Sequence, residues 1–317
     1  MTDNLVVVLA GGLSHERDVS LRSGRRVAAA LRDAGCEVLE SDVTAGLLGR
    51  LTDLGRPVVF PVLHGGAGED GALRQALELV GVPFVGASAA ASRGAFDKAI
   101  GTRAAGRAGL RTPQQVALPD DLFRELGAAD LVAALGERLG FPMFVKPARS
   151  GSALGCTRVD RIEDLPQAMV KAYGYGQSAV VEAFLTGTEV AVAVVDTGDG
   201  PRALPAVEIR PDSGVYDYEA RYTAGQTRFI APAEISDEVR DRCAEMAVRA
   251  HEVLDLADIS RTDMIIGDDG EPVFLEVNVS PGMTETSLLP LAVEAAGLDL
   301  GTLLLQLADV ARRRGAR

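Results

Sequence analysis

The sequence predicts an α/β protein with a parallel sheet in its first part and antiparallel strands in its last part. The first observation is an alternation of short apolar runs with helical patterns through about residue 88, which is typical of strand–helix–strand units. The second is the alternating stretch EVAVAVVD, which begins a β-rich region at Glu189. The third is the length of 317 residues, which exceeds one ordinary core and indicates two or three domains.

Short elements follow one another closely in the amino-terminal part. Leu5–Ala10 is an apolar run that ends at two glycines, which fits a buried parallel strand. A helical pattern from Val19 to Leu31 places its apolar residues on one side and its arginines mostly on the other. The further elements expected here are strands at Val38–Leu39 and Val58–Val62, a helix at Leu73–Val80, and a turn and strand at Gly81–Val85.

The rest of the chain adds longer helices and the β-rich region. A helical period covers Ala89–Leu110 and stops before a proline, and a second helix is expected at Leu122–Leu139. Arg210–Thr227 is polar, turn-rich and aromatic, so we expect a long loop, and such loops inside compact domains usually act as lids. The remaining expected elements are strands at Pro142–Lys146, at Val180–Glu182 and from Glu189, a helix at Ser236–Leu254, two strands, and a last helix at Leu300–Arg312.

The composition argues against several classes of protein. The formal net charge of −13 argues against a nucleic-acid surface, because such surfaces need basic patches. No run approaches the roughly 18 apolar residues of a membrane span, and no basic region precedes the first strand. We therefore expect no membrane anchor and a cytoplasmic location. Cys36, Cys156 and Cys243 lie far apart and form no CxxC pair, which argues against a disulfide framework.

A hairpin near the carboxyl terminus predicts a metal site. In the stretch RTDMIIGDDGEPVFLEVN, two β-rich runs flank Asp269-Gly270, a strong signal for a two-residue turn. In that register Asp263 lies opposite Glu276. Arg261 lies opposite Asn278, and strand alternation puts both pairs on one face. Carboxylate and amide oxygens are the ligands that Mg²⁺ prefers; the alternative is an exposed polar face, but this apolar run is expected to be buried.

A glycine-rich loop predicts a phosphate site. The loop ARSGSALG, residues 148–155, follows a predicted strand, and its N–H groups and hydroxyls suit phosphate oxygens. Lys146 adds a cation directly before it. The loop alone is a weak signal, because glycine-rich surface turns are common. The chain lacks GxxxxGK[ST], GxSxG and HExxH, and has no GxGxxG after its first strand, which disfavours P-loop, hydrolase, zinc-protease and Rossmann interpretations.

Seven blocks along the chain carry these features and others. They are GGLSHERDVSLRSG (11–24), HGGAGEDGALRQALELVGVPFVG (64–86), DK (97–98), VKPARSGSALG (145–155), YDYEARY (216–222), SRTD (260–263) and LEVNVSPGMTETSLLP (275–290). In content, order and spacing they resemble the signatures of D-alanine–D-alanine ligases, over nearly the whole chain. The resemblance implies a three-domain ATP-grasp fold. The domains would be an N-terminal parallel-sheet domain over 1–96 and two ATP-clamping domains over 97–182 and 183–317, the last with a lid loop at about 210–227.

The resemblance also implies a reaction, its cofactors and its partners. ATP would phosphorylate the carboxylate of a first D-alanine, and the amine of a second would attack the acyl phosphate. Activation is needed because a carboxylate is a poor electrophile. The resemblance implies two Mg²⁺ ions, which Mn²⁺ could replace, and leaves a monovalent cation open. It further suggests a homodimer that serves peptidoglycan precursor synthesis.

The resemblance assigns roles position by position. The amino-acid site would comprise Glu16 at the first ammonium, His64 near its carboxylate, Arg261 and the Gly282 N–H at the oxyanion, and Ser287 and Leu288 at the second D-alanine. The ATP site would comprise Lys98, Lys146 and Arg221 at the phosphates, Ser152 in the loop, and Glu182, Phe184, Leu185 and Glu189 around adenine and ribose. The magnesium ligands would be Asp263, Glu276 and Asn278. A hydrogen-bonded bridge would link Ser152 and Tyr222 to Glu16 and close the lid.

Two positions depart from the family pattern and leave alternatives open. Ala153 stands where the phosphate loop commonly has a second serine, and Arg221 stands where the lid usually has lysine. The alternatives are a related ligase with D-lactate or another amino acid as acceptor, and a catalytically silent nucleotide-binding protein. Without the resemblance, Glu16 would be interpreted as a helix cap, His64 as a turn residue and Tyr222 as a packed aromatic.

Overall fold

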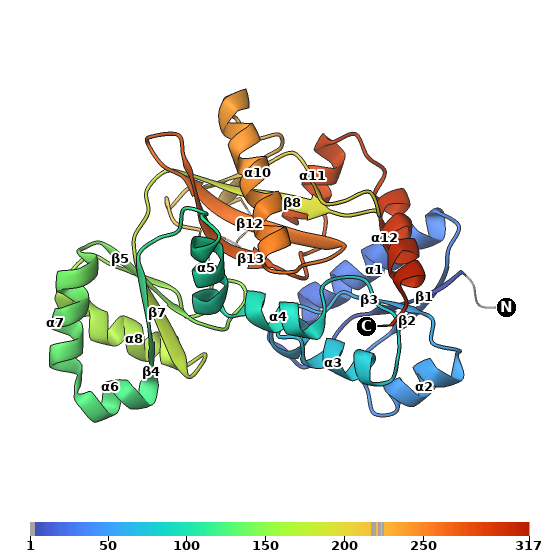
Figure 1. The fold of residues 1–317 in the computed structure, drawn as a ribbon, viewed down its shortest axis with the longest axis horizontal. Coiled ribbons are helices and arrows are strands. Elements are labelled where there is room, and N and C mark those ends of the chain that lie inside the picture. Colours follow the sequence, from blue (N-terminus) through green and yellow to red (C-terminus); the bar gives the residue numbers. More distant parts are fainter. Residues whose placement is uncertain (1–3, 217–219, 221–222, 224, 317) are drawn as a thin grey trace.

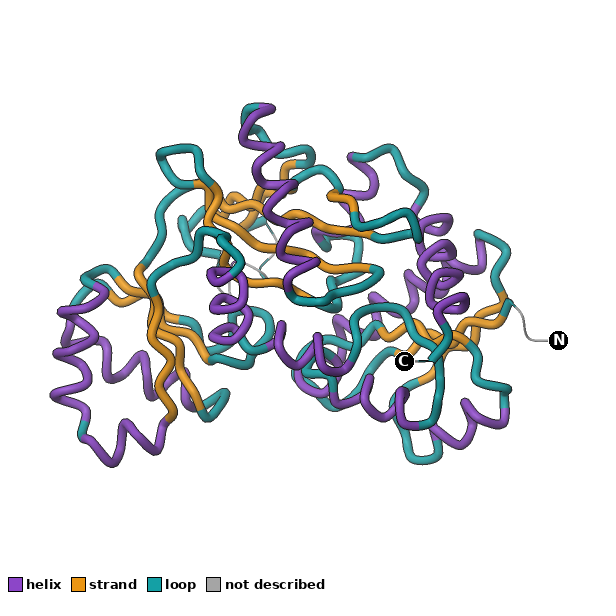
Figure 2. The backbone as a smooth tube through the Cα atoms, in the orientation of Figure 1, coloured by secondary structure: helices purple, strands orange, loops and turns teal. Residues whose placement is uncertain are grey.

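The computed structural model describes residues 4–216, 220, 223 and 225–316. It shows a mixed α/β protein in which three successive parts of the chain each build one sheet (Figure 1). Figure 2 shows helices along the outer sides of these sheets, with the sheet of the last part in the middle of the molecule. No single helix among the described residues is long and apolar enough to span a membrane. Only the bent pair 288–295 and 300–314 passes that test, by length and composition alone.

The first sheet is parallel and has the strand order β2-β1-β3. Its strands are β1 (Leu5–Leu9), β2 (Glu37–Ser41) and β3 (Val58–Pro61), and its helices are α1 (Arg17–Asp33), α2 (Leu47–Asp53) and α3 (Ala72–Leu79). β1 and β3 are buried along their whole length, as the apolar runs predicted. The strand expected at Gly81–Val85 is reduced to one bridge between Val59 and Phe84. α12 (Leu300–Arg314), from the other end of the chain, packs on α1 and β3 (Figure 1).

The second sheet is antiparallel, with the order β4-β7-β5-β6. Its strands are β4 (Gln115–Pro119), β5 (Met143–Pro147), β6 (Thr157–Val159) and β7 (Ser178–Ala183). The helices beside it are α6 (Asp120–Leu126), α7 (Ala128–Leu139) and α8 (Leu165–Tyr173). A separate apolar cluster, which includes Met143 and Met169, holds these helices against one face of the sheet. The other face is therefore free to line a site.

The third sheet has six antiparallel strands and contains the predicted hairpin. Its path is β11 (Thr227–Ile230), β10 (Val207–Pro211), β8 (Thr188–Val195), β12 (Ile259–Ile266) and β13 (Pro272–Asn278), and β9 (Arg202–Ala203) pairs with β8. α10 (Asp237–Val253) packs on β8, β12 and β13, whereas α11 (Leu288–Ala295) packs on β8 and β10. Apolar residues of alternating parity belong to two different clusters, so both faces of the sheet are covered.

Two helices expected as single elements are each broken in two, so those predictions were wrong. The segment predicted as Ala89–Leu110 forms α4 (Ala89–Phe96) and α5 (Lys98–Arg107). Asp97 lies between them in an extended conformation and accepts hydrogen bonds from two N–H groups of α5 as its N-cap. The segment predicted as Leu122–Leu139 breaks at Gly127, whose φ is +82°. A helical period continues through both breaks, and only local backbone chemistry interrupts it.

The predicted hairpin is present, but its turn is longer than expected. Ile266 pairs with Pro272, so five residues and not two connect the strands. The register then shifts between Asp263 and Met264, which is a β-bulge. Because the bulge adds one residue to β13, Asp263 still pairs with Glu276. The expected pairs at the far end of the hairpin are therefore confirmed.

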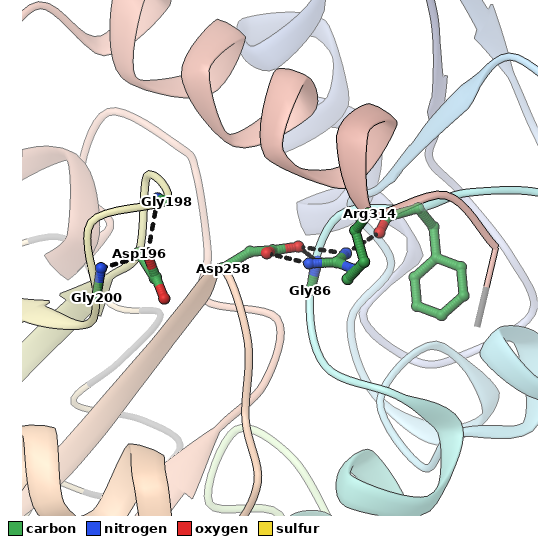
Figure 3. Close-up of polar contacts among 7 residues, drawn as sticks. Gly86, Asp196, Gly198, Gly200, Asp258 and Arg314 are labelled. Atoms are coloured by element: carbon green, nitrogen blue, oxygen red, sulfur yellow. Dashed lines mark hydrogen bonds and ion pairs between the residues drawn. The ribbon is translucent and has the colours of Figure 1, made fainter.

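An ion pair at the buried Asp258 connects the third sheet and α12 with the first part of the chain (Figure 3). Asp258, only 2% exposed, lies just before β12 and accepts hydrogen bonds from both terminal nitrogens of Arg314 on α12. The same carboxylate accepts the Gly86 N–H at 2.7 Å, and Arg314 also donates to the Phe84 carbonyl at 2.8 Å. The end of α12 is thereby fixed to both the third sheet and the segment that follows α3.

Candidate active site

A cavity of about 450 Å³, the main cavity, lies between the second and third sheets. Its walls come from β5 and β7 on one side and from β8, β10, β12 and β13 on the other. Six of the residues predicted to bind ATP line it together. They are Lys98, Lys146, Glu182, Phe184, Leu185 and Glu189.

One part of the main cavity is apolar and aromatic. The rings of Phe144 and Phe184 lie 6.2 Å apart, and the Arg158 guanidinium lies 4.5 Å from the centre of the Phe184 ring. Ile209 and Leu275 line the cavity from the third sheet. Phe144 was not predicted, although it stands two positions before Lys146 in a strand and must share its face. Such a slot between two sheets suits a flat aromatic ring.

The opposite part of the main cavity gathers charge. Lys146 forms a buried ion pair with Glu182 at 2.8 Å. Burial opposes the charge of Lys146, but Glu182 and Glu276 outweigh it and raise the pKa of the lysine. Lys98 donates to the Ser150 carbonyl at 2.6 Å and forms an ion pair with Glu276 at 3.1 Å. The break at residue 97 makes Lys98 the first residue of α5. The raised pKa keeps Lys146 charged at neutral pH, as phosphate binding requires.

The hairpin carries the predicted metal ligands at the junction of two cavities. Glu276 lines both the main cavity and a smaller one, the loop cavity, which lies beside residues 150–152. Asp263 faces the first cavity and Asn278 the second. Arg261 donates to both oxygens of Asp263 at 2.7 Å, and Asn278 accepts the N–H of Ser280 at 2.7 Å. No group of three or more His, Cys, Asp or Glu side chains among the described residues could hold a metal.

The donor set nevertheless fits a hard divalent cation. It consists of two carboxylates and one amide oxygen, and Mg²⁺ sites in nucleotide enzymes commonly use one or two carboxylates with substrate phosphates. Lys98 and Arg261 neutralise Glu276 and Asp263 in this structure. Arg261 is buried, and although burial opposes its charge, Asp263 and Glu276 keep its pKa above the usual value.

The phosphate loop meets the predicted amino-acid site through Glu16. Ser152 Oγ donates a hydrogen bond to Glu16 Oε1, so the structure brings these two predicted residues together. Ser152 and Ala153 have φ of +52° and +55°, so the loop holds two consecutive left-handed residues that are not glycine. A Cβ placed on Gly65 or Gly151 would lie 2.4 or 2.5 Å from Glu16 Oε2. The Glu16 carboxylate is therefore held closely between two glycines.

His64 lies between Ser280 and Ser23 in this structure. Its Nδ1 lies 3.1 Å from the Ser280 carbonyl, to which it donates, and its Nε2 lies 3.1 Å from Ser23 Oγ. Ser23 Oγ accepts the Met283 N–H, so it donates its own proton to the imidazole. Burial lowers the pKa of His64 to about 4, which keeps the ring neutral. Both ring nitrogens are used, so His64 fixes the segment after β13 to α1, and its predicted role near the first carboxylate stays a prediction.

The residues predicted to receive the second D-alanine line neither of the two cavities. Ser287 is the N-cap of α11, and its hydroxyl contacts the N–H and the hydroxyl of Thr284 at 3.0 and 2.8 Å. A Cβ on Gly282 would lie 2.7 Å from Ser287 Oγ, so these two predicted residues are neighbours. Leu288 follows as the first residue of α11 and is buried. Arg221 and Tyr222 lie outside the described residues, and their predicted contacts stay predictions.

Two further residues, which the sequence did not reveal, face the site. Glu69 lines the loop cavity and is 5% exposed. Tyr216 lines the main cavity and packs edge-on against Phe229, with ring centres 6.1 Å apart. An acid in a glycine-rich turn has the sequence signature of a surface residue, so no pattern distinguishes Glu69. Tyr216 belongs to the YDYEARY block, and that block was the only available signal.

Comparisons with known proteins cover nearly the whole chain. The family models for the D-ala D-ala ligase C-terminus and N-terminus match residues 106–309 and 41–87. The D-alanine–D-alanine ligase of Desulforudis audaxviator is 39% identical over 310 residues, which is 97% of this chain and 98% of that protein. That of Bordetella petrii is 39% identical over 306 residues, 96% of this chain and 91% of that protein.

Solved structures show the same agreement. The VanG D-Ala:D-Ser ligase from Enterococcus faecalis superposes with a TM-score of 0.84 at 29% identity, over 98% of this chain and 99% of that one. The D-alanine–D-alanine ligase of Bacillus anthracis, solved with ATP, gives a TM-score of 0.81 at 26% identity over 98% of both chains. The expected ATP-grasp fold is thus confirmed, and the chain belongs to the D-alanine–D-alanine ligase family.

Proposed function

We propose that this protein uses ATP to join two D-alanines into D-alanyl-D-alanine, through a D-alanyl phosphate, for peptidoglycan precursor synthesis. The observation that carries the proposal is the joined pair of cavities. One has an aromatic slot and a cationic end, and the other places Ser152, Arg261 and Lys98 around a common space. The relatives that align with nearly the whole length of this chain are named for the same reaction.

ATP would enter the main cavity with its base in the aromatic slot. Phe144 and Phe184 offer ring faces, and Glu189, on the neighbouring strand β8, offers an acceptor to ribose hydroxyls. Lys98 and Lys146 would meet the phosphates, because both already lie at the charged end of the cavity. Binding phosphate there requires each lysine to exchange its present carboxylate partner, at least in part, for the ligand.

The metal ligands of the proposed site would be Asp263, Glu276 and Asn278. When bound, Mg²⁺ would offset the charge on the phosphates during phosphoryl transfer, and two ions, replaceable by Mn²⁺, are the family expectation. A monovalent-cation requirement remains part of the proposal. Arg261 lies beside this set and points its charge at the loop cavity, where it would stabilise an oxyanion.

The chain's own residues would order the two amino acids. Glu16 would bind the ammonium of the first D-alanine, with Ser152 fixing the orientation of its carboxylate. The phosphorylated carboxylate would then lie toward Arg261 and the Gly282 N–H. Ser287 and Leu288 would receive the second D-alanine, and Tyr222 and Arg221 would close the lid over the site.

The test is phosphate release from ATP and Mg²⁺ with D-alanine as the sole amino acid, followed by mass analysis of the product. Release together with the mass of D-alanyl-D-alanine is the expected result. No release with D-alanine, D-serine or D-lactate would leave the silent nucleotide-binding alternative as the explanation. Ala153 is not expected to prevent turnover, because its position can contribute a backbone N–H without a side chain.

A second candidate is ligation of D-alanine to a different acceptor. The observation that favours it is the similarity to the VanG D-Ala:D-Ser ligase, together with Arg221 in place of the usual lid lysine. The test that separates the candidates supplies D-alanine, D-serine and D-lactate at equal concentration and identifies the products by mass analysis. A predominant D-alanyl-D-serine or D-alanyl-D-lactate product would replace the first proposal.

The assembly and organisation of the protein are proposed on the same basis. We expect a cytoplasmic homodimer that binds neither nucleic acid nor membrane. Domain boundaries at 96/97 and 182/183 would place Lys98 at the start of the central domain and end that domain with β7. Sedimentation of the full chain tests the dimer, and limited proteolysis tests the boundaries.

A further inference from the structure

Glu69 is a buried carboxylate that the proposed reaction does not yet use. It lies in the turn after the 3₁₀ helix Gly66–Gly68, just before α3, and is 5% exposed. Its side chain lines the loop cavity together with Ser152 and Arg261. A carboxylate in this position is costly unless something compensates its charge.

The contacts of Glu69 leave half of its carboxylate free. Its Oε2 accepts the Gly65 N–H at 3.0 Å, and Oε1 forms no hydrogen bond to any described residue. Arg74 on α3 and Lys98 on α5 are the nearby cations, and both are directed to backbone carbonyls, at Gly68 and Ser150. Across the loop cavity lie Arg261 and Glu276 of the hairpin.

Glu16 lines a neighbouring cavity and lies against the same glycine, Gly65. A Cβ on Gly65 would meet Glu16 Oε2 at 2.4 Å, so both carboxylates lie against the backbone of one residue. No Lys or Arg among the described residues forms an ion pair with Glu16 or Glu69 within 4.0 Å. Burial and then the charge of Glu16 raise the pKa of Glu69 to about 7, against the Gly65 N–H, Lys98 and Arg74. Because no cation of the described residues pairs with these two carboxylates, together they form a site for one.

We infer that Glu69 and Glu16 together bind the ammonium group of the donor amino acid, an inference that rests on the proposed function. An ammonium has three N–H donors, so it can reach both carboxylates and still contact a third acceptor. Its charge lets Glu69 ionise beside Glu16, because an opposite charge within a few ångströms favours the ionised form. Binding of the donor therefore expels the proton that Glu69 holds in the free enzyme.

The same arrangement makes Glu69 a determinant of donor specificity. A hydroxy acid in the donor position brings no positive charge, so Glu69 keeps its proton and the half-buried Glu16 receives no cationic ligand. The site thus selects an amino acid as donor even where the acceptor position tolerates other nucleophiles. Rejection of an analogue that leaves buried polar groups unpaired is typically strong.

Calorimetric titration of D-alanine into the full-length protein, saturated with Mg²⁺ and a non-hydrolysable ATP analogue, tests the inference. Titrations at pH 7 in two buffers of different ionisation enthalpy measure the protons released. The wild type should release about half a proton per donor bound, since the pKa of Glu69 is about 7. Glu69→Gln should release none and bind about 10- to 100-fold more weakly. Glutamine still accepts the Gly65 N–H, so the fold should persist.

Glu40→Gln is the matched control, because it removes an exposed carboxylate on β2 that lines neither the main cavity nor the loop cavity. It should behave like the wild type. The wild type alone gives a second readout: its affinity for D-alanine should fall about tenfold per pH unit below pH 7, as Glu69 becomes protonated.

The outcomes separate the two proposals. Absence of any D-alanine binding to the wild type would overturn the proposed function. Binding with equal affinity and equal proton release in the wild type and in Glu69→Gln would overturn the role of Glu69 and leave the proposed function standing. A pH-independent wild-type affinity between pH 7 and 5 would also overturn it, whether or not the variant folds.

Discussion

Gly65→Ala is expected to lower both stability and activity, and its loss of activity should exceed that of a neighbouring glycine variant of similar stability. Gly65 has φ +69° and ψ 161°, a region that only glycine adopts easily, so alanine costs roughly 1–3 kcal/mol of folding free energy. The added Cβ would also lie 2.4 Å from Glu16 Oε2. The carboxylate is the far end of a flexible side chain, so it can move away. To reach ordinary contact at 3.4 Å it must shift by about 1 Å.

That displacement sets the expected loss of activity. A misplacement of about 1 Å at a binding group can cost on the order of 100-fold in rate, equivalent to about 2.7 kcal/mol of transition-state free energy. Gly66→Ala is the matched control. Gly66 also has positive φ, at +47°, but a Cβ there meets nothing within 4 Å. It should lose similar stability and little activity.

The assay compares both variants by thermal unfolding and by kcat/KM for D-alanine, measured through ADP release. Gly151→Ala adds an independent approach from the phosphate loop, since its Cβ would lie 2.5 Å from the same Glu16 oxygen. If Gly65→Ala lost no more activity than Gly66→Ala, the assignment of Glu16 to the amino-acid site would be refuted.

Four further outcomes are expected. Glu276→Gln should abolish turnover with an unchanged circular dichroism spectrum, because it removes a proposed metal ligand; full activity would exclude that role. Asp258→Asn should lower the free energy of unfolding in urea by about 3 kcal/mol, because it leaves Arg314 without its buried partner. Phe184→Ala should raise the KM for ATP about tenfold and leave that for D-alanine nearly unchanged, as loss of one ring face predicts. Burial lowers the pKa of His64 to about 4 in the folded protein, so above pH 6.5 the ring is neutral in both states and the folded protein keeps its full stability. Between pH 6.5 and 4 the unfolded state binds a proton more readily, and this stability is lost. His64→Gln should remove about 3 kcal/mol of this pH dependence of unfolding.

Burial decided which parts of the fold could be predicted from the sequence. β1 and β3 are covered on both faces, so their apolar runs are visible in the sequence. β4 alternates between half-buried and exposed residues, and gives no such signal. The break before Lys98 depends on Asp97, which caps α5 inside an otherwise helical period. From the sequence, Asp97 could not be distinguished from a surface residue of one long helix.

The candidate site was predictable where residues share a strand and obscure where they meet through turns. Lys146 marks the face of β5 that carries the predicted phosphate site, and strand alternation places Phe144 on the same face. Glu69 and Glu16 become neighbours only through a turn and a helix start, which no local period encodes. The contacts of His64 were hidden for the same reason, since its partners Ser23 and Ser280 are 41 and 216 positions away in the sequence. They occupy both of its ring nitrogens.

The hairpin shows how a correct pairing can follow from an incorrect turn. A two-residue turn at Asp269-Gly270 was expected, and the real connection is longer, which by itself would place Asp263 opposite Leu275. The bulge at Leu275 restores the pair with Glu276. Because side chains alternate along a strand, a regular ladder would have turned Glu276 toward α10 and away from the cavity. Leu275 and Glu276 both line the main cavity, and the irregularity is what keeps the second carboxylate paired with Asp263 at the site.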